Sequence, residues 1–189
     1  MSLFEAIAAG DEDALRDELE RDPESAGVRS ADGLSPVLFA LYNGQAELVG
    51  PILDVNPALD VFDAAAVGRT HGLEALLDDE PGLATAWSAD GFTALHLAAF
   101  FGQEDAAKLL LACGAEPNTV ARNATIVVTP LHSAAAGAHS AIVKLLLEAG
   151  ADPNARQPDG FTALDAAQQN GDDESAEALL AAGATPRPA

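Results

Sequence analysis

The chain has 189 residues, of which 49% are hydrophobic, many of them alanine, and only 5% are aromatic. It has 9 basic and 30 acidic residues, and the resulting net charge of −21 argues against binding to nucleic acid or anionic membranes, because both need clustered Lys and Arg. The one cysteine, Cys113, excludes an internal disulfide. The start of the chain lacks a signal segment and no apolar run is long enough to span a membrane, so we expect a soluble, cytoplasmic protein.

The first half of the chain predicts three helical pairs, in residues 1–31, 32–57 and 58–89, the first of them an N-terminal cap. Each pair has a glycine where its first helix ends, a position that favours left-handed backbone. These glycines are Gly10, Gly44 and Gly68. Gly10 and Gly44 are 34 residues apart, but Gly44 and Gly68 are only 24 apart, about nine short of the 33-residue spacing found later in the chain. The unit at 32–57 is therefore expected to lack a projecting loop and to close with a tight turn at Asn56-Pro57. Pro51 is expected to shorten or kink the second helix of that unit.

The second half predicts three more pairs, in residues 90–125, 126–158 and 159–189, the last of them a C-terminal cap. Their first helices open at Thr93, Thr129 and Thr162, which are separated by 36 and 33 residues. In each unit a Leu-Leu pair is followed by Gly-Ala, in the same register. Helical pairs that recur at this period cannot bury an apolar face alone and stack on their neighbours.

This pattern resembles the ankyrin repeat, which has a period of about 33 residues and the signature T-P-L-H-x-A. The segment Thr129–Ala134 matches that signature letter for letter. The resemblance implies an all-α fold, an ankyrin-repeat α-solenoid of stacked helix–turn–helix units with short β-hairpin fingers, forming a single domain over residues 1–189. It also implies a non-enzymatic module that binds a partner protein or peptide in a concave groove, formed by the first helices and the fingers.

The histidines and the cysteine do not predict a catalytic, metal or cofactor site. The resemblance makes His96 and His132 structural, since both occupy the histidine position of the signature, and His139 falls in a position where the family often has histidine. His71 is expected in a solvated loop, and no phosphate loop, nucleophile motif or metal-ligand spacing occurs. We therefore expect no enzyme and no cofactor.

The resemblance places the two residues before each helix-ending glycine in the groove, where Phe100 and Phe101 are unusual. The finger between Asn118 and Thr129 has ten residues where the next has seven, and it is rich in strand-forming valine and isoleucine. A single apolar patch for a partner is predicted from these features. Its residues are Trp87, Phe92, Phe100, Phe101, Val120 and Ile126, and Tyr42 is expected to be an outlying contact with the same partner.

Several alternatives remain open at this point. Phe100 or Phe101 could pack under the longer finger, and Trp87 could equally be a packing residue. The acidity could speed association with a basic partner, or reflect adaptation to high salt without a dedicated groove partner. A small-molecule-binding or hydrolytic protein on the same stack, or an acidic mimic of nucleic acid, are further readings. The chain is expected to be a monomer.

Overall fold

The computed structural model describes residues 1–186, and the contacts of the chain group into two compact units, Met1–Asp63 and Ala64 onward. The N-terminal unit contains two helical pairs, followed by the first residues of a helix that continues into the C-terminal unit. Its helices are α1 Leu3–Ala9, α2 Glu12–Arg21, α3 Pro36–Tyr42 and α4 Val49–Asp54, and the boundary helix is α5 Val61–Ala66. Short 3-10 helices at Pro23–Gly27 and Ala46–Leu48 precede α3 and α4.

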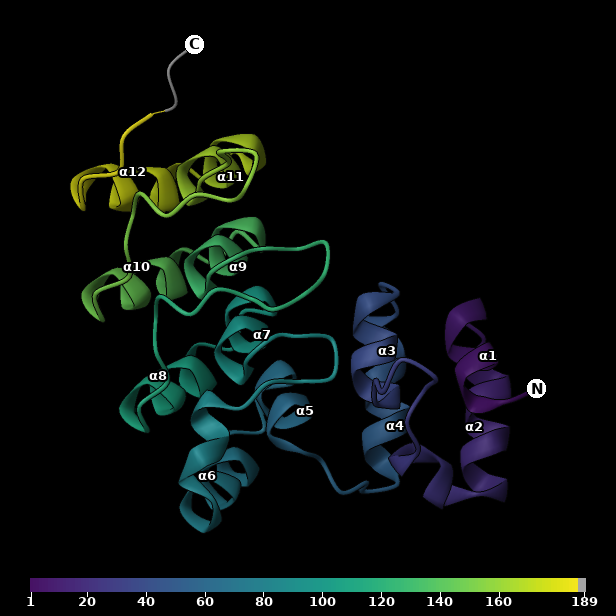
Figure 1. Ribbon diagram of the computed structural model, residues 1–189. Helices are drawn as coiled ribbons and strands as arrows, with labels where there is room; N and C mark the ends of the chain where they lie inside the picture. The colour runs from purple at the N-terminus through teal and green to yellow at the C-terminus, as the bar shows by residue number, and fades with distance from the viewer. Residues whose placement is uncertain (187–189) are drawn as a thin grey trace. The chain divides into compact units, whose positions relative to one another are not determined.

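The C-terminal unit is a stack of helical pairs in two layers. Its helices are α6 Thr70–Asp79, α7 Ala94–Phe100, α8 Glu104–Ala112, α9 Pro130–Ala136, α10 Ser140–Glu148, α11 Ala163–Asn170 and α12 Asp173–Ala181. A 3-10 helix at Pro81–Thr85 follows α6. Helices α7, α9 and α11 lie above one another in an inner layer, and α8, α10 and α12 form the outer layer (Figure 1).

The predicted all-α stack of helical pairs is confirmed, and each predicted unit contains its two helices. The prediction of one continuous domain stays a prediction, and the last three residues of the unit 159–189 lie outside the described residues. The shortened unit has a six-residue second helix, α4, in which Pro51 lies in the first turn. There the missing N–H of proline costs no helical hydrogen bond. Asn56 makes the predicted turn with a left-handed φ of 53°.

The inner helices begin with reciprocal caps that the sequence pattern supplies. The side chain of the threonine before each helix accepts from the backbone N–H of the residue three positions later. The side chain of that residue accepts from the backbone N–H of the threonine. Both N–H groups lack a partner within the helix, so the two bonds satisfy them. These pairs are Thr93 with His96, Thr129 with His132, and Thr162 with Asp165. Buried alanines such as Ala98 and Ala134, both 0% exposed, let α7 and α9 pack closely.

The glycine at the end of each first helix adopts left-handed backbone, as predicted. Gly10, Gly44, Gly68, Gly102 and Gly171 all have φ between 65° and 75°. In the fifth unit an alanine occupies this position, and Ala138 has a φ of 56°. A side chain with a Cβ pays a steric penalty there that glycine does not.

Replacing Ala138 with glycine is therefore expected to stabilise the C-terminal unit by about 0.5–1 kcal/mol. This value is the backbone strain that glycine relieves, minus the free energy lost because glycine makes the unfolded chain more flexible. Chemical denaturation measures the change. The matched variant Ala136→Gly, two residues earlier in α9, is expected to lower the stability by up to about 1 kcal/mol. A destabilising Ala138→Gly would contradict the strain inferred for this position.

The fingers are loops without strands in residues 1–186, which differs from the predicted β-hairpins. Three of them close with a backbone hydrogen bond that spans three residues, and in each a glycine N–H donates back to the carbonyl of the residue that starts this bond. The N–H donors and carbonyl acceptors are Ser30 and Leu34, Ser88 and Phe92, and Gln157 and Phe161. In the longer finger the bond from Ala121 to Val128 spans six residues, which accounts for its three extra positions. A single bond cannot start a ladder, so the valines of this finger do not form a strand.

Candidate functional site

The predicted partner-binding residues divide by exposure. Tyr42, Phe100, Val120 and Ile126 are exposed at 39%, 45%, 49% and 49%, whereas Trp87, Phe92 and Phe101 are half-buried. Tyr42 lies on α3 in the N-terminal unit, and the other six lie in the C-terminal unit. The described contacts join some of these residues into two groups, one at the end of α7 and one on the fingers.

Phe100 and Phe101 form the first group, at the C-terminal end of α7. Their rings meet edge to face with centroids 5.1 Å apart. His139 of the next pair donates from Nε2 to the carbonyl oxygen of Phe100, at 3.0 Å. A methyl group at Gly137 would come within 2.6 Å of the same oxygen, so the two repeats approach closely here. The backbone of Phe100 is thus held by the next repeat while its ring stays exposed.

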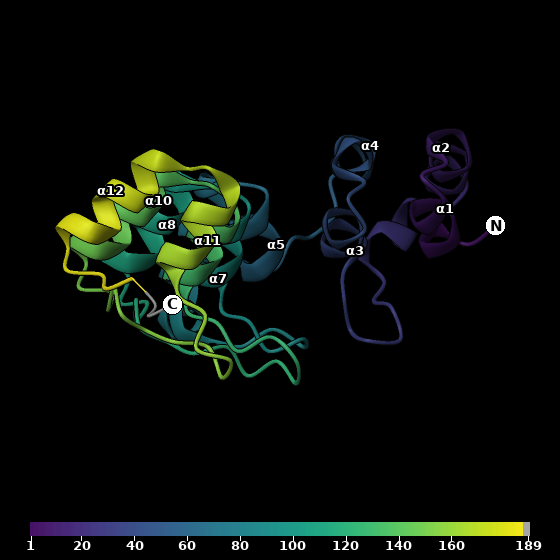
Figure 2. The same cartoon turned by 90° about the horizontal axis from the view of Figure 1, so that it is seen from above.

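The second group lies where the long finger docks on the preceding finger. The Arg122 N–H donates to the carbonyl of Gly91 at 2.8 Å, and the Asn123 side chain donates to the carbonyl of Asp90 at 2.8 Å. The Arg122 guanidinium lies over the ring of Trp87, 4.1 Å from its centroid. Fingers of neighbouring pairs project on the same side of the unit (Figure 2). Val120 and Ile126 are exposed on the long finger of this docked pair.

The two groups lie at opposite ends of α7. The finger that carries Trp87 and Phe92 leads into the start of this helix at Ala94, and Phe100 ends it six residues later, about 9 Å along the axis. Phe92 contacts the ring of His96 rather than the phenylalanine pair, with centroids 5.9 Å apart. Among the described residues, the contacts therefore form two apolar groups.

Sequence reasoning missed three residues that shape these groups. Arg122 covers Trp87, and the signal for it was an arginine in the lengthened finger of a chain that has few basic residues. The repeat pattern predicts a histidine at position 139 but not its bonding partner. The bond from His139 to the Phe100 carbonyl joins residues 39 positions apart, and no nearby residue indicates it. Asn123 also forms the turn of the long finger, since its side-chain oxygen accepts from the N–H groups of Thr125 and Ile126.

Charge is distributed unevenly between the two layers of the C-terminal unit. Helices α7 and α9 contain no Asp, Glu, Lys or Arg, and α11 contains only Asp165. The outer helices carry the acidic residues, and both lysines lie there. Lys108 pairs with Glu104, and Lys144 with Glu174, each at 2.5 Å. The surface around Phe100 is therefore uncharged along the inner helices, and the negative charge lies mainly on the outer layer.

His96 and His132 are buried and belong to the helix caps. Nδ1 of His96 accepts from the hydroxyl of Thr93 at 2.8 Å, and Nε2 faces the Val128 carbonyl of the next unit at 3.1 Å. Burial lowers the pKa of His96 to about 4 and also lowers the pKa of His132. A neutral ring suits His96, in which Nδ1 accepts and Nε2 donates, whereas the buried Nε2 of His132 has no hydrogen-bond partner among the described residues.

No group of three or more His, Cys, Asp or Glu side chains in residues 1–186 is arranged to hold a metal ion. Cys113 is exposed at the end of α8. Among the described helices, none is long and apolar enough to cross a membrane.

Comparison with known proteins agrees with the repeat pattern. The sequence model of the family described as ankyrin repeats (3 copies) matches residues 3–121 and 122–188. No curated protein matches the chain.

Proposed function

Because the chain belongs to the ankyrin-repeat family, we propose that it binds a partner protein or peptide through the inner surface of its C-terminal unit, with Phe100 as the central contact. Ankyrin repeats are generally protein–protein interaction modules and are typically non-enzymatic. The observation that carries the proposal is the exposed ring of Phe100, on a backbone that His139 holds in place. A rigid, exposed aromatic side chain loses little conformational entropy when a partner covers it.

The neighbouring residues support an apolar contact. Ala136 ends the next inner helix and Gly137 follows it, and both residues are small, so the His139 ring is the large side chain of that repeat that lies against the Phe100 backbone. Phe101 supports the exposed ring from the side. We propose that an apolar side chain of the partner docks against Phe100, and that Val120 and Ile126 on the long finger form a second contact. Trp87 and Phe92 hold the finger, and Tyr42, which belongs to the N-terminal unit, is not part of this surface.

The acidic outer layer is proposed to act at longer range. Charges around an uncharged contact speed association with a basic partner and slow it with an acidic one. Salt should therefore lower the association rate with such a partner, and leave the contribution of Phe100 to the dissociation rate nearly unchanged.

Site-specific photocrosslinking tests the proposal. A photoreactive phenylalanine analogue replaces Phe100 in one protein and Leu180, on outer helix α12, in a matched control. Leu180 is 46% exposed and Phe100 45%, so the two positions are equally accessible. We expect position 100 to crosslink a discrete protein in a lysate of the source cells and position 180 to crosslink none. The same products from both positions, or none from position 100, would contradict the proposal.

A further inference from the structure

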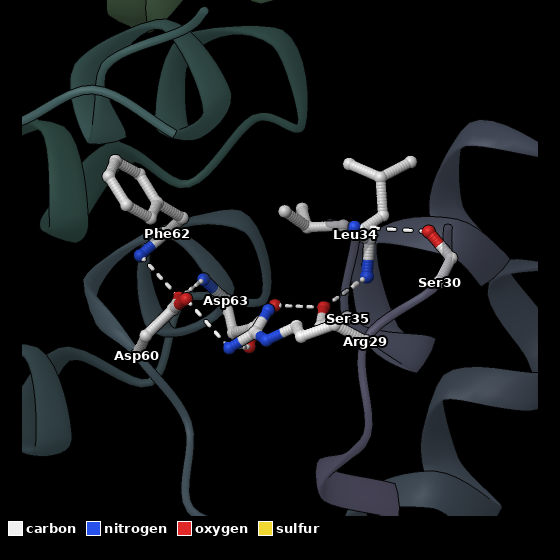
Figure 3. A network of polar contacts seen from close by, with 8 residues as sticks. Arg29, Ser30, Leu34, Ser35, Asp60, Phe62 and Asp63 are labelled. Carbon is white, nitrogen blue, oxygen red and sulfur yellow. Dashed lines mark hydrogen bonds and ion pairs between the residues drawn. The ribbon is translucent and has the colours of Figure 1, made fainter. Parts of the chain in front are cut away.

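A cluster of polar side chains at the start of α5 is not used by the proposed binding surface. Asp60 accepts at Oδ1 from the backbone N–H groups of Phe62 and Asp63, at 2.9 and 2.8 Å, and so caps the helix (Figure 3). The Ser35 hydroxyl, at the start of α3, donates to Oδ1 of Asp63 and accepts from the N–H of Leu38 at 3.0 Å. Asp63 thereby links the starts of α3 and α5.

Arg29 is the cation of this cluster, and it lies closer to one carboxylate than to the other. Its Nη2 is 2.9 Å from Oδ2 of Asp60 and 3.7 Å from Oδ2 of Asp63. A turn places Arg29 beside Ser35, because the Leu34 N–H donates to the Ser30 hydroxyl at 3.1 Å (Figure 3). One guanidinium therefore faces two carboxylates.

Burial separates the two aspartates. The side chain of Asp60 is 36% exposed, so water stabilises its charge, whereas that of Asp63 is 3% exposed. When Asp63 is ionised, its carboxylate accepts one hydrogen bond, from the Ser35 hydroxyl, and lies 3.7 Å from the Arg29 guanidinium. These two interactions replace the water that burial removes. With Asp63 protonated, the cluster would be a neutral pair of Arg29 with Asp60, and less charge would be buried.

We propose that Asp63 is a proton-binding site, and that the cluster of Arg29, Ser35, Asp60 and Asp63 fastens the start of α5 to the start of α3 more tightly in mildly acidic than in neutral solution. The charged groups that face Asp63 are Asp60, from the residues preceding α5, and Arg29, from the loop preceding α3. Ser35 at the start of α3 adds a hydroxyl. The device belongs to the N-terminal unit and does not depend on the proposed partner surface.

The acid–base behaviour of Asp63 agrees with this geometry. Burial, and after it the charge of Asp60, raises the pKa of Asp63 from 3.8 to about 6, although the Ser35 hydroxyl and Arg29 both act to lower it. Because the pKa is higher in the folded state, the folded unit binds the proton more tightly. The resulting stabilisation is fully present below pH 3.8 and is lost as the pH rises through about 6.

Amide hydrogen exchange of Leu38 and Asp63, corrected for intrinsic rates, measures the opening of this link. In the wild-type protein the opening constant is expected to fall about tenfold from pH 7.5 to pH 5, which is one unit below the pKa. In Asp63→Asn, which resembles the protonated side chain, the constant should be equally low at both pH values. The matched variant Asp165→Asn replaces the aspartate at the same helix position of α11 and should keep the tenfold change.

An opening constant that does not fall in the wild type, or an Asp63→Asn protein with the wild-type pH profile, would overturn the proposal. If Asp63→Asn does not fold, NMR titration of the Asp63 carboxyl carbon in the wild-type protein decides. A midpoint near 6 supports the proposal and one near 4 overturns it. Arg29→Gln should raise the midpoint further, and a lower midpoint would also overturn the proposal, because the guanidinium favours the ionised form.

Discussion

Lowering the pH from 7 to 5 is expected to destabilise the C-terminal unit by about 2 kcal/mol through His96 alone. The pKa of His96 is lowered from 6.5 to about 4 by burial, so the unfolded chain binds the proton more tightly. The stability is fully present above pH 6.5 and is lost as the pH falls through about 4. At pH 5 protonation of His96 favours the unfolded chain over the folded protein by a factor of about thirty. This factor corresponds to a loss of about 2 kcal/mol in the free energy of unfolding.

Burial of the ring is the main reason for the lowered pKa of His96, and the position of the ring in a helix cap agrees with a neutral side chain. Nδ1 accepts from Thr93 in the cap of α7, and protonation would turn this acceptor into a donor. His132 makes the same cap in α9, and its lowered pKa acts in the same direction. Asp63 acts in the opposite direction in the N-terminal unit, so mild acid is expected to weaken one unit and strengthen the other.

Chemical denaturation followed by tryptophan fluorescence measures the effect, because the one tryptophan, Trp87, lies in the C-terminal unit. His96→Gln should be less stable at pH 7 and lose most of the pH dependence. His139→Gln, which replaces a histidine whose side chain makes no helix-cap hydrogen bond, should keep it. Equal unfolding free energies of the wild-type protein at pH 5 and pH 7 would contradict the role assigned to His96.

Replacing Gly91 by alanine is expected to cost about 3 kcal/mol, because two effects add at this finger position. Gly91 has a φ of 85°, which a side chain with a Cβ rarely adopts. The added Cβ would also lie 2.6 Å from the backbone carbonyl carbon of Arg122, where the long finger docks. Backbone atoms cannot move aside as a flexible side chain can, so the docking of the two fingers should be disturbed.

Gly160→Ala is the matched control for this variant. Gly160 occupies the same position in the finger before α11 and has a φ of 83°, but a Cβ there meets nothing within 4 Å. It should cost only the backbone strain, about 1–2 kcal/mol. Thermal and chemical denaturation compare the two, and the Trp87 emission should shift in Gly91→Ala as the ring loses Arg122. Equal costs in the two variants would show that the docked fingers add nothing.

The repeat pattern predicted the helices because the signals for them are local. Thr129 and Pro130 start α9, and Gly102 ends the turn after α7, through interactions that span only a few positions. The left-handed position of Ala138 could be predicted only by counting along the repeats, since alanine itself does not favour it. Consistent local signals of this kind explain why the fold could be predicted from the sequence.

The candidate site could be predicted only in part, because its contacts join distant positions. Phe100 and Phe101 were both expected to be exposed, but only Phe100 is exposed and Phe101 is half-buried. Consecutive residues at the end of a helix do not face the same way. The stacking of Arg122 on Trp87 depends on how the long finger docks, which its composition does not specify. The link from Ser35 to Asp63 spans 28 positions between two different helices.

The affinity of the crosslinked partner for three proteins tests the central claim most directly. Isothermal titration calorimetry compares the wild-type protein with Phe100→Ser and with Leu180→Ser, each first shown to be folded by circular dichroism. Loss of a central aromatic contact costs at least about 2 kcal/mol, so Phe100→Ser should bind at least about thirtyfold more weakly. Leu180→Ser should bind within about twofold of the wild-type protein. Equal affinities of the Phe100→Ser and wild-type proteins would show that the inner surface of the C-terminal unit does not hold the partner through Phe100.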